Sequence, residues 1–231
     1  MPFRATIFDL DGTLLDTLDD IANAANRVLA ARGFAAHPNS NYRAFIGEGV
    51  VRLISRVLPE AHQDEVTVRA CIEAYVQEYA RNWNVKTKPY AGVPEMLDDL
   101  VEGGLKLAVL SNKPDHFTQQ CVRELLAKWS FDVVLGASEA FPRKPDPASA
   151  LETARRLGVL PAECLYVGDS GIDMQTARAA GMYAVGALWG FRGKEELLRE
   201  GAHILIEEPG EILDLLDRQR TADSLPYEDG A

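Results

Sequence analysis

The sequence predicts an α/β protein with a doubly wound, Rossmann-like parallel sheet and a small helical domain inserted after the first strand. Six short segments indicate the sheet, because they are almost continuously apolar, as strands buried on both faces are. They are residues 5–10, 106–112, 132–139, 164–170, 183–190 and 203–208. From Pro94 onward the residues between them show helical periodicity, and this alternation of strand and helix is typical of such a core.

The helical insert is indicated by residues 18–83, which carry helical periodicity and little strand signal. Thr17 followed by Asp20 resembles a capping box at the start of its first helix, and Gly33 is the expected stop. Three further helices are expected near Asn41, from near Gly49, and over residues 65–83.

These patterns also predict the domain boundaries. We expect the α/β core to comprise residues 1–15 and 86–218, and the helical cap to comprise residues 16–85. The last residues, 219–231, are polar and without periodicity, so we expect a disordered tail there.

The composition limits the classes of function. The chain has 231 residues, with 24 Lys and Arg against 35 Asp and Glu, which gives a net charge of −11. This charge argues against nucleic-acid binding, which depends on neutralising phosphates with Lys and Arg. No apolar run is long enough to span a membrane, and the N-terminus fits neither a signal peptide nor a transit peptide.

The three cysteines, Cys71, Cys121 and Cys164, are widely spaced and leave one unpaired in any disulfide scheme. Free, buried thiols in a reducing compartment are the simplest interpretation. We therefore expect a cytoplasmic protein without membrane association and without an obligate protein partner.

Three of the predicted strands end in polar clusters, "DLDGT", "LSNKP" and "VGDSGID". Ligands of an open α/β sheet lie at the carboxyl ends of its strands. If these strands are adjacent, at the usual spacing of about 4.8 Å, four carboxylates converge there: those of Asp9, Asp11, Asp169 and Asp173. Such a group needs a hard cation, and oxygen ligands of this kind suit Mg²⁺.

The motifs and their order closely resemble those of the haloacid dehalogenase superfamily, over about residues 4–190. The stretch "DLDGT", which begins at Asp9, resembles the first of four motifs, and Ser111 in "AVLSN" the second. Lys144 in "FPRKPDP" resembles the third, and "GDSGIDM" the fourth. The second motif has Ser where many members have Thr, but either residue supplies a hydroxyl.

The resemblance implies a Mg²⁺-dependent phosphomonoester hydrolase that acts through an aspartyl-phosphate. Asp9 would be the nucleophile and a metal ligand. Asp11 would be the general acid and base, and its backbone carbonyl would bind the metal. Ser111 would donate a hydrogen bond to the phosphate, with help from main-chain N–H groups around Gly12 and Asn112.

The resemblance also assigns the remaining charged residues of the core. Lys144 would offset the charge of the phosphate, and Asp169 would bind the metal directly. Asp173 would bind the metal or orient its waters and Lys144, although an acid that complements a helix dipole is the alternative. Lys113 is either a substrate-binding residue or a surface lysine.

The cap stretch "NYRAFIGEGVVRLI" and the linker "KPYAGVPEMLDDL" resemble the phosphoglycolate phosphatase subfamily. This resemblance implies a small phosphorylated metabolite as substrate, an acidic phosphoester such as 2-phosphoglycolate. Arg43 is the candidate for binding its carboxylate, with a helix-surface arginine as the alternative. The loop of Gly47, Glu48 and Gly49 is expected to enter the site.

Other functions remain open at this point. Related phosphatases act on sugar phosphates, nucleotides or pyrophosphate, and a sugar phosphomutase shares all four core motifs. The acid at position 11 argues against a dehalogenase, and the absence of lysine from residues 16–85 excludes the mechanism of a phosphonate-cleaving relative. A non-catalytic phosphate-binding or regulatory module on the same fold is the alternative from another class.

Overall fold

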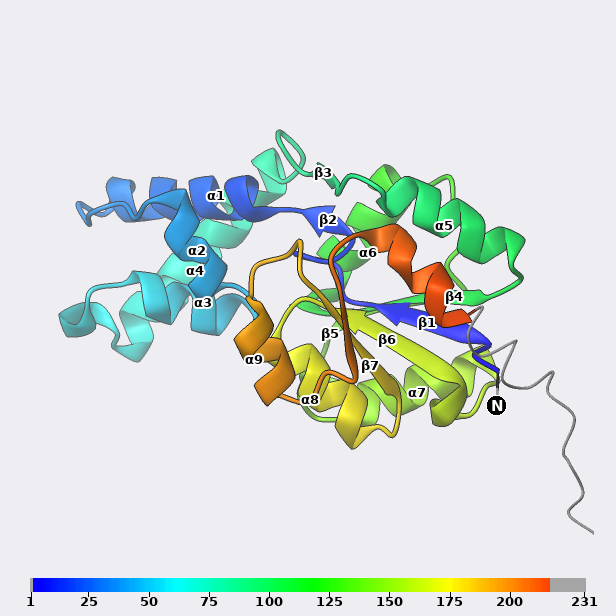
Figure 1. Cartoon of the computed structure of the whole chain (residues 1–231). Helices are drawn as coiled ribbons and strands as arrows, with labels where there is room; N and C mark the ends of the chain where they lie inside the picture. The colour runs from blue at the N-terminus through cyan, green and yellow to red at the C-terminus, as the bar shows by residue number, and fades with distance from the viewer. Residues whose placement is uncertain (1, 217–231) are drawn as a thin grey trace, which may run out of the picture.

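The computed structural model of the chain describes residues 2–216. The predicted tail at residues 219–231 lies outside the described residues, as do the last two of the predicted core. Figure 1 shows a sheet flanked by helices and, beyond the carboxyl end of β1 (Ala5–Phe8), a separate group of helices.

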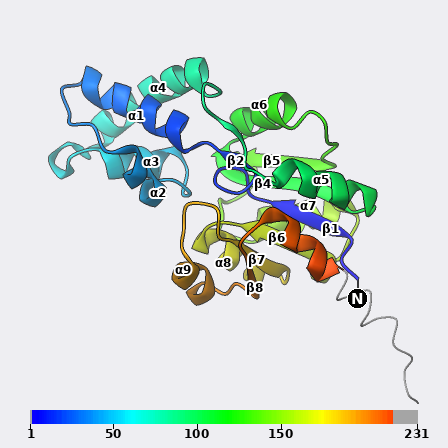
Figure 2. The same cartoon turned by 45° about the horizontal axis from the view of Figure 1, so that its top comes forward.

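Six parallel strands form the main sheet, in the order β5–β4–β1–β6–β7–β8 (Figure 2). The strands after β1 are β4 (Lys106–Pro114), β5 (Val133–Ala137), β6 (Cys164–Gly168), β7 (Tyr183–Ala187) and β8 (Ile204–Ile206). Each apolar segment predicted as a strand overlaps one of these six, with β4 extending two residues beyond its predicted end, so the prediction of a doubly wound parallel sheet is confirmed. The strand order changes direction at β1, and ligands of such sheets bind at this kind of switch point.

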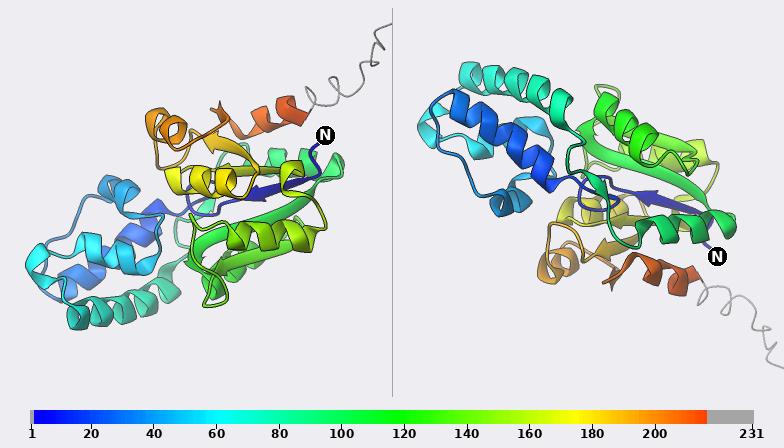
Figure 3. Two further views of the ribbon diagram at one scale, coloured as in Figure 1. Left: turned by 90° about the horizontal axis from the view of Figure 1, so that it is seen from below. Right: turned by 90° about the horizontal axis from the view of Figure 1, so that it is seen from above.

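Helices cover both faces of the sheet (Figure 3). One face packs against α7 (Ala148–Leu157), α8 (Gly171–Ala179) and α9 (Lys194–Arg199). The other packs against α5 (Val93–Glu102) and α6 (Asp115–Leu125). Ile7 and Phe8 of β1 belong to the two different cores. Because alternate residues of β1 face two apolar layers, the strand is apolar almost throughout.

The inserted helices form a cap beside the sheet (Figure 2). They are α1 (Leu18–Ala31), α2 (Tyr42–Phe45), α3 (Val50–Val57) and α4 (Glu65–Asn82). Both α1 and α3 pack against α4, around buried side chains such as Val28, Leu53 and Tyr75. The helices begin close to the predicted places. The described residues also form short 3-10 helices, at Asn39–Asn41, Glu60–His62, Pro161–Glu163 and Pro209–Glu211.

The two crossings between core and cap lie side by side, which the sequence did not indicate. There β2 (Leu15–Asp16) pairs antiparallel with β3 (Lys88–Pro89). The backbone N–H of Tyr90 also donates to the carbonyl of Leu14, at 3.2 Å. The outgoing and returning chains are therefore tied together at the base of the cap.

Asp20 strengthens this junction. The capping box predicted from Thr17 and Asp20 is therefore wrong. The Thr17 side chain makes no capping hydrogen bond. The buried carboxylate of Asp20 instead accepts three hydrogen bonds at 2.8 Å, from Lys86 N, Thr87 N and Thr87 Oγ1. An acid at this spacing looks like a cap in sequence, but the returning linker offers it three donors.

Two smaller predictions can be compared with the structure. Cys71, Cys121 and Cys164 are all free and buried, as expected. Among the described residues, no helix combines the length and apolar character needed to cross a membrane.

We expect Asp20→Ala to lower the free energy of unfolding by about 2–4 kcal/mol, because it leaves three donors without their acceptor, two of them on buried Thr87. Urea denaturation followed by circular dichroism measures this change. Asp19→Ala is the matched control, since half-exposed Asp19 contacts only the exposed Lys86 ammonium and the Asn39 amide near the surface and should contribute less than about 1 kcal/mol. Equal effects of the two substitutions would contradict the role given to Asp20.

Candidate active site

The candidate site lies at the carboxyl ends of the three central strands. Phe8 of β1 is in register with Val109 of β4 and Val167 of β6. The polar residues that follow these positions therefore meet at one edge of the sheet, which confirms that the three strands are adjacent. Asp9 follows β1 and Asp169 follows β6, whereas Ser111 lies within the last residues of β4.

Three buried carboxylates gather there. Asp9, Asp169 and Asp173 each offer an oxygen, and these three oxygens lie within 4.8 Å of one another. Burial, with further contributions from the neighbouring carboxylates, raises the pKa of Asp9 to about 6 and that of Asp169 to about 8. Such a set of oxygen donors fits a hard divalent cation, which would relieve their mutual repulsion.

Lys144 compensates part of this negative charge. Its Nζ lies 2.9 Å from Asp9 Oδ1 and 2.7 Å from Asp173 Oδ1, and it donates to the carbonyl of Leu110 at 3.0 Å. The contact with Asp9 lacks hydrogen-bond geometry, so Asp9 Oδ1 is left with an ion pair but no directed donor. Burial alone would lower the pKa of Lys144, but Asp173 and Asp9 outweigh it and raise that pKa well above its usual value.

Asp173 also has the structural role weighed as the alternative. Its Oδ2 accepts from Ser170 N at 3.1 Å and from Ser170 Oγ at 2.5 Å, which closes a capping box at the start of α8. Because this cap uses Oδ2, Oδ1 stays directed at Lys144. The helix start thus fixes the orientation of a residue in the carboxylate cluster.

Asp169 is held by two residues to which the sequence gave no role. Thr13 Oγ1 donates to its Oδ1 at 3.1 Å, and the backbone N–H of Phe191 donates to its Oδ2 at 2.7 Å. Gly12 lies against the same carboxylate, with φ of +91°, and a Cβ there would be 2.4 Å from Asp169 Oδ2. Thr13 was visible within the first motif, but the loop that carries Phe191 gave no signal.

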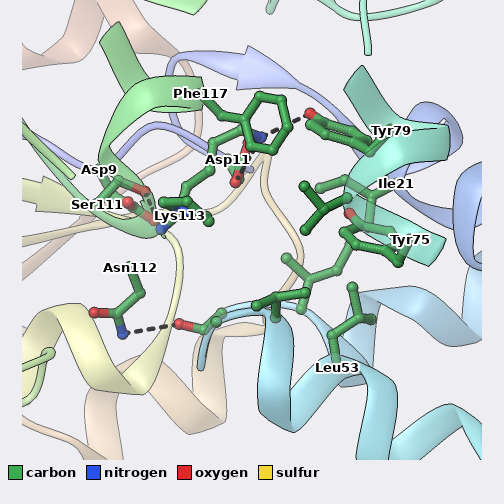
Figure 4. Close-up of a pocket in the computed structure, with 16 residues that line it drawn as sticks. Asp9, Asp11, Ile21, Leu53, Tyr75, Tyr79, Ser111, Asn112, Lys113 and Phe117 are labelled. Atoms are coloured by element: carbon green, nitrogen blue, oxygen red, sulfur yellow. Dashed lines mark hydrogen bonds and ion pairs between the residues drawn. The ribbon is translucent and has the colours of Figure 1, made fainter. Parts of the chain in front are cut away.

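Asp11 is turned away from the carboxylate cluster. Its carboxylate pairs with Lys113 Nζ, at 2.8 and 3.2 Å from its two oxygens. Lys113 is buried and also donates to Tyr79 Oη of α4, at 2.7 Å (Figure 4). The two acids of the first motif therefore have separate lysines, Lys144 for Asp9 and Lys113 for Asp11. A main-chain contact of Asp11 with a metal stays a prediction.

A cavity of about 60 Å³ lies between these residues and the cap (Figure 4). A water molecule needs about 10–15 Å³ on this measure, so the cavity has room for roughly four to six waters. The core contributes polar residues to its wall: Asp9, Asp11, Ser111, Asn112 and Lys113. The cap contributes mostly apolar ones, together with two tyrosines: Ile21, Ile46, Val50, Leu53, Tyr75, Val76 and Tyr79. Such a space suits a small group beside the reacting centre.

Asn112 connects the core to the cap loop. Its Nδ2 donates to the carbonyls of Gly47 and Lys144, both at 3.1 Å, and its Oδ1 accepts from Lys144 N at 3.0 Å. Gly47 and Gly49 line the cavity, as the sequence predicted for this loop. The Asn112 side chain therefore positions the loop and the backbone of Lys144.

Arg43 and Glu48 are placed elsewhere. Arg43 Nη1 donates to the carbonyl of Gly190 at 2.8 Å, and Glu48 forms an ion pair with Arg56. Neither residue is among those that line the cavity. The structure thus brings the predicted core residues together. The two cap residues lie instead at the outer junction between the cap and the core, beside the loop of Phe191. Tyr75 and Tyr79, which the sequence analysis did not select, occupy the cap wall instead.

The fold and the site define a class of protein, an α/β protein with a buried acidic centre beneath a helical cap. Comparison with known proteins gives the family. Residues 6–187 match the model of the haloacid dehalogenase-like hydrolases. A phosphoglycolate phosphatase of Xylella fastidiosa is 38% identical over 209 residues, which cover 89% of this chain and 90% of that protein. A phosphoglycolate phosphatase of Aquifex aeolicus is 33% identical over 214 residues, which cover 93% of this chain and 97% of that protein.

A solved structure agrees with this assignment. The crystal structure of a candidate phosphoglycolate phosphatase from Lactobacillus delbrueckii subsp. bulgaricus superposes with a TM-score of 0.88 at 33% identity. The match covers 94% of this chain and 99% of that one. The chain belongs to the haloacid dehalogenase-like hydrolase family, and its relatives make it a phosphatase of that family.

We expect Gly190→Ala to damage the site, because a Cβ at this position would be 2.2 Å from Asp169 Cβ and 2.4 Å from the Gly12 carbonyl. The free energy of unfolding should fall by about 1–3 kcal/mol, and phosphate release from an aryl phosphate should fall with it. Gly193→Ala is the matched control in the same loop, since no atom lies within 4 Å of its added Cβ. A Gly190→Ala protein as active and stable as this control would show that the packing there is not needed.

Proposed function

We propose that the chain is a Mg²⁺-dependent phosphomonoester hydrolase that forms an aspartyl-phosphate on Asp9 and acts on 2-phosphoglycolate or a similar small acidic phosphoester. One observation carries the proposal. The two acids of the "DLDGT" motif lie at the floor of one cavity, each with its own buried lysine. This arrangement separates a nucleophile from an acid–base group only two residues away.

Asp9 is the nucleophile in this proposal. A carboxylate oxygen attacks the phosphorus, the bond from phosphorus to the leaving oxygen breaks, and an acyl phosphate forms. Lys144 holds the attacking carboxylate beside Asp173 and offsets its charge. Ser111 lies in the cavity wall next to Asp9, where its hydroxyl can donate to a phosphoryl oxygen.

Asp11 transfers the protons. Its carboxyl group gives a proton to the leaving oxygen in the first step and takes one from water in the second. That water attacks the phosphorus and breaks the bond to Asp9, which releases phosphate, restores the Asp9 carboxylate and leaves Asp11 protonated for the next turnover. The pairing of Asp11 with Lys113 and of Asp9 with Lys144 supports this division of roles.

The carboxylates of Asp9, Asp169 and Asp173 are the side-chain ligands proposed for Mg²⁺. When bound, the ion supplies positive charge that offsets repulsion between the attacking carboxylate and the phosphate dianion. Thr13 and Phe191 orient Asp169 for this role, and Ser170 orients Asp173.

The choice of substrate rests on the named relatives and on the cavity. The cavity places a mostly apolar cap wall opposite the polar residues of the core. Among the described residues that line it, Lys113 is the one cationic side chain. A phosphomutase needs a second phosphate site, so this lining favours hydrolysis of a small ester.

A panel of phosphoesters tests the proposal. Phosphate release is measured from 2-phosphoglycolate, sugar phosphates, nucleotides and pyrophosphate, with Mg²⁺ and with a chelator. We expect release that depends on Mg²⁺ and is fastest from 2-phosphoglycolate. Preference for another ester would support the phosphatase chemistry and contradict 2-phosphoglycolate as the substrate. Absence of release from every ester by the folded protein with Mg²⁺ would reject the function and favour a binding module.

We expect Asp9→Asn to lower kcat by about a thousandfold or more, because the amide is a poor nucleophile. The asparagine has nearly the same shape, so circular dichroism and the melting temperature should show an intact fold. Asp16→Asn, in the β2 crossing, is the control for loss of one negative charge near the site. Near-normal turnover by Asp9→Asn would overturn the assignment of the nucleophile.

A further inference from the structure

The cap wall of the cavity carries two tyrosine hydroxyls directed at the core. Tyr75 and Tyr79 are one helical turn apart on α4, and their rings stack with centroids 5.6 Å apart at 13°. Both are buried, with 6% and 2% of their surface exposed, and both line the cavity. Figure 4 shows the two rings side by side, facing the strand that carries Lys113.

These hydroxyls have hydrogen-bonding capacity that the protein does not use. Tyr79 Oη accepts from Lys113 Nζ, so its own O–H proton is still available. Among the described residues, the Tyr75 hydroxyl has no hydrogen-bond partner, although its environment is largely apolar. Burial raises the pKa of both phenols, so each keeps its proton and acts as a donor. The Tyr75 hydroxyl therefore faces the cavity as a free donor, which a ligand with an acceptor can engage.

Lys113 adds the charge that a neutral pair of hydroxyls lacks. Its ammonium lies 2.8 Å from Asp11 Oδ1 and also 4.8 Å from the centre of the Tyr79 ring. Lys113 is the one cationic side chain among the described residues that line the cavity. Arg43 lies outside the cavity, where it donates to the carbonyl of Gly190. The rest of the wall at this end is apolar, with Ile21, Leu53 and Phe117. An anion placed there would meet one positive charge and two O–H donors beside a largely apolar wall.

We propose that Lys113, Tyr75 and Tyr79 form a subsite for a carboxylate on the leaving group of the substrate. This inference deepens the proposed function and rests on it. A carboxylate bound there shares the ammonium with Asp11 and so lies beside the residue that protonates the leaving oxygen. Because Tyr75 and Tyr79 belong to the cap and Lys113 to the core, the subsite is complete only with both parts in contact. Specificity for an acidic substrate is thus assigned to the cap–core contact.

Two phosphoesters of matched size test the subsite. 2-Phosphoglycolate and ethyl phosphate differ in having a carboxylate or a methyl group on the same carbon. We expect the protein to favour 2-phosphoglycolate in kcat/KM. Lys113→Met should lower kcat/KM for 2-phosphoglycolate about 10- to 100-fold more than for ethyl phosphate. Tyr75→Phe should lower it roughly three- to tenfold, mostly through KM, and leave ethyl phosphate unchanged.

Tyr75→Phe is the decisive variant, because Lys113→Met also removes the partner of Asp11 and can slow both reactions. Tyr183→Phe and Lys128→Met are the matched controls, since both residues lie away from the cavity. A Tyr75→Phe protein that loses activity equally on both esters, or on neither, would overturn the subsite. Selective loss on 2-phosphoglycolate would support it.

Binding separates failure of the subsite from failure of the proposed function. Calorimetry with Asp9→Asn protein and Mg²⁺ compares the affinities for the two esters, with and without Tyr75→Phe. Tighter binding of 2-phosphoglycolate that Tyr75→Phe weakens supports the subsite, even if the native protein releases no phosphate. Equal affinity for the two esters overturns the subsite, even if the native protein hydrolyses both.

Discussion

Repulsion among buried carboxylates at the ends of β1 and β6 is the constraint around which this molecule is organised. The oxygens of Asp9, Asp169 and Asp173 lie within 4.8 Å of one another, and Asp11 is only two residues from Asp9. Concentrated negative charge without water is unfavourable unless cations and hydrogen-bond donors compensate it. The chain supplies two buried lysines, and the geometry leaves a place for a divalent cation. The acidic centre can exist because strands far apart in sequence bring these groups to one edge.

The second feature that follows from this constraint is the use of the surrounding backbone. Gly12, Gly168 and Gly190 each lie so close to Asp169 or Asp173 that a Cβ would approach a carboxylate side chain to within 2.4 Å. Thr13, Ser170 and the N–H of Phe191 complete the set of donors. Each acid is thereby fixed in one orientation, which a preorganised catalytic centre requires.

The cap depends on the same centre. Lys113 joins Asp11 to Tyr79 of α4, and Asn112 joins the Lys144 segment to the carbonyl of Gly47. The groups that balance charge in the core therefore also hold the cap against it. On the far side of the junction, Arg43 contacts the loop that carries Phe191 and so lies next to the support of Asp169. The contact of the cap with the core therefore involves the same residues that orient the acids of the centre.

The sequence by itself determined the six strands, the helical insert and the polar residues at the strand ends, because strands buried on both faces and motifs at their ends are local patterns. It did not indicate that Asp11 turns from the other three carboxylates to Lys113. It could not place Arg43, which was expected at the substrate and instead binds the carbonyl of Gly190. Nor could it find Tyr75 and Tyr79, which look like ordinary apolar-face residues of α4. Asp20 resembled a cap residue but holds the returning linker. These roles depend on which distant segments meet, and only the packing of the cap against the sheet decides that.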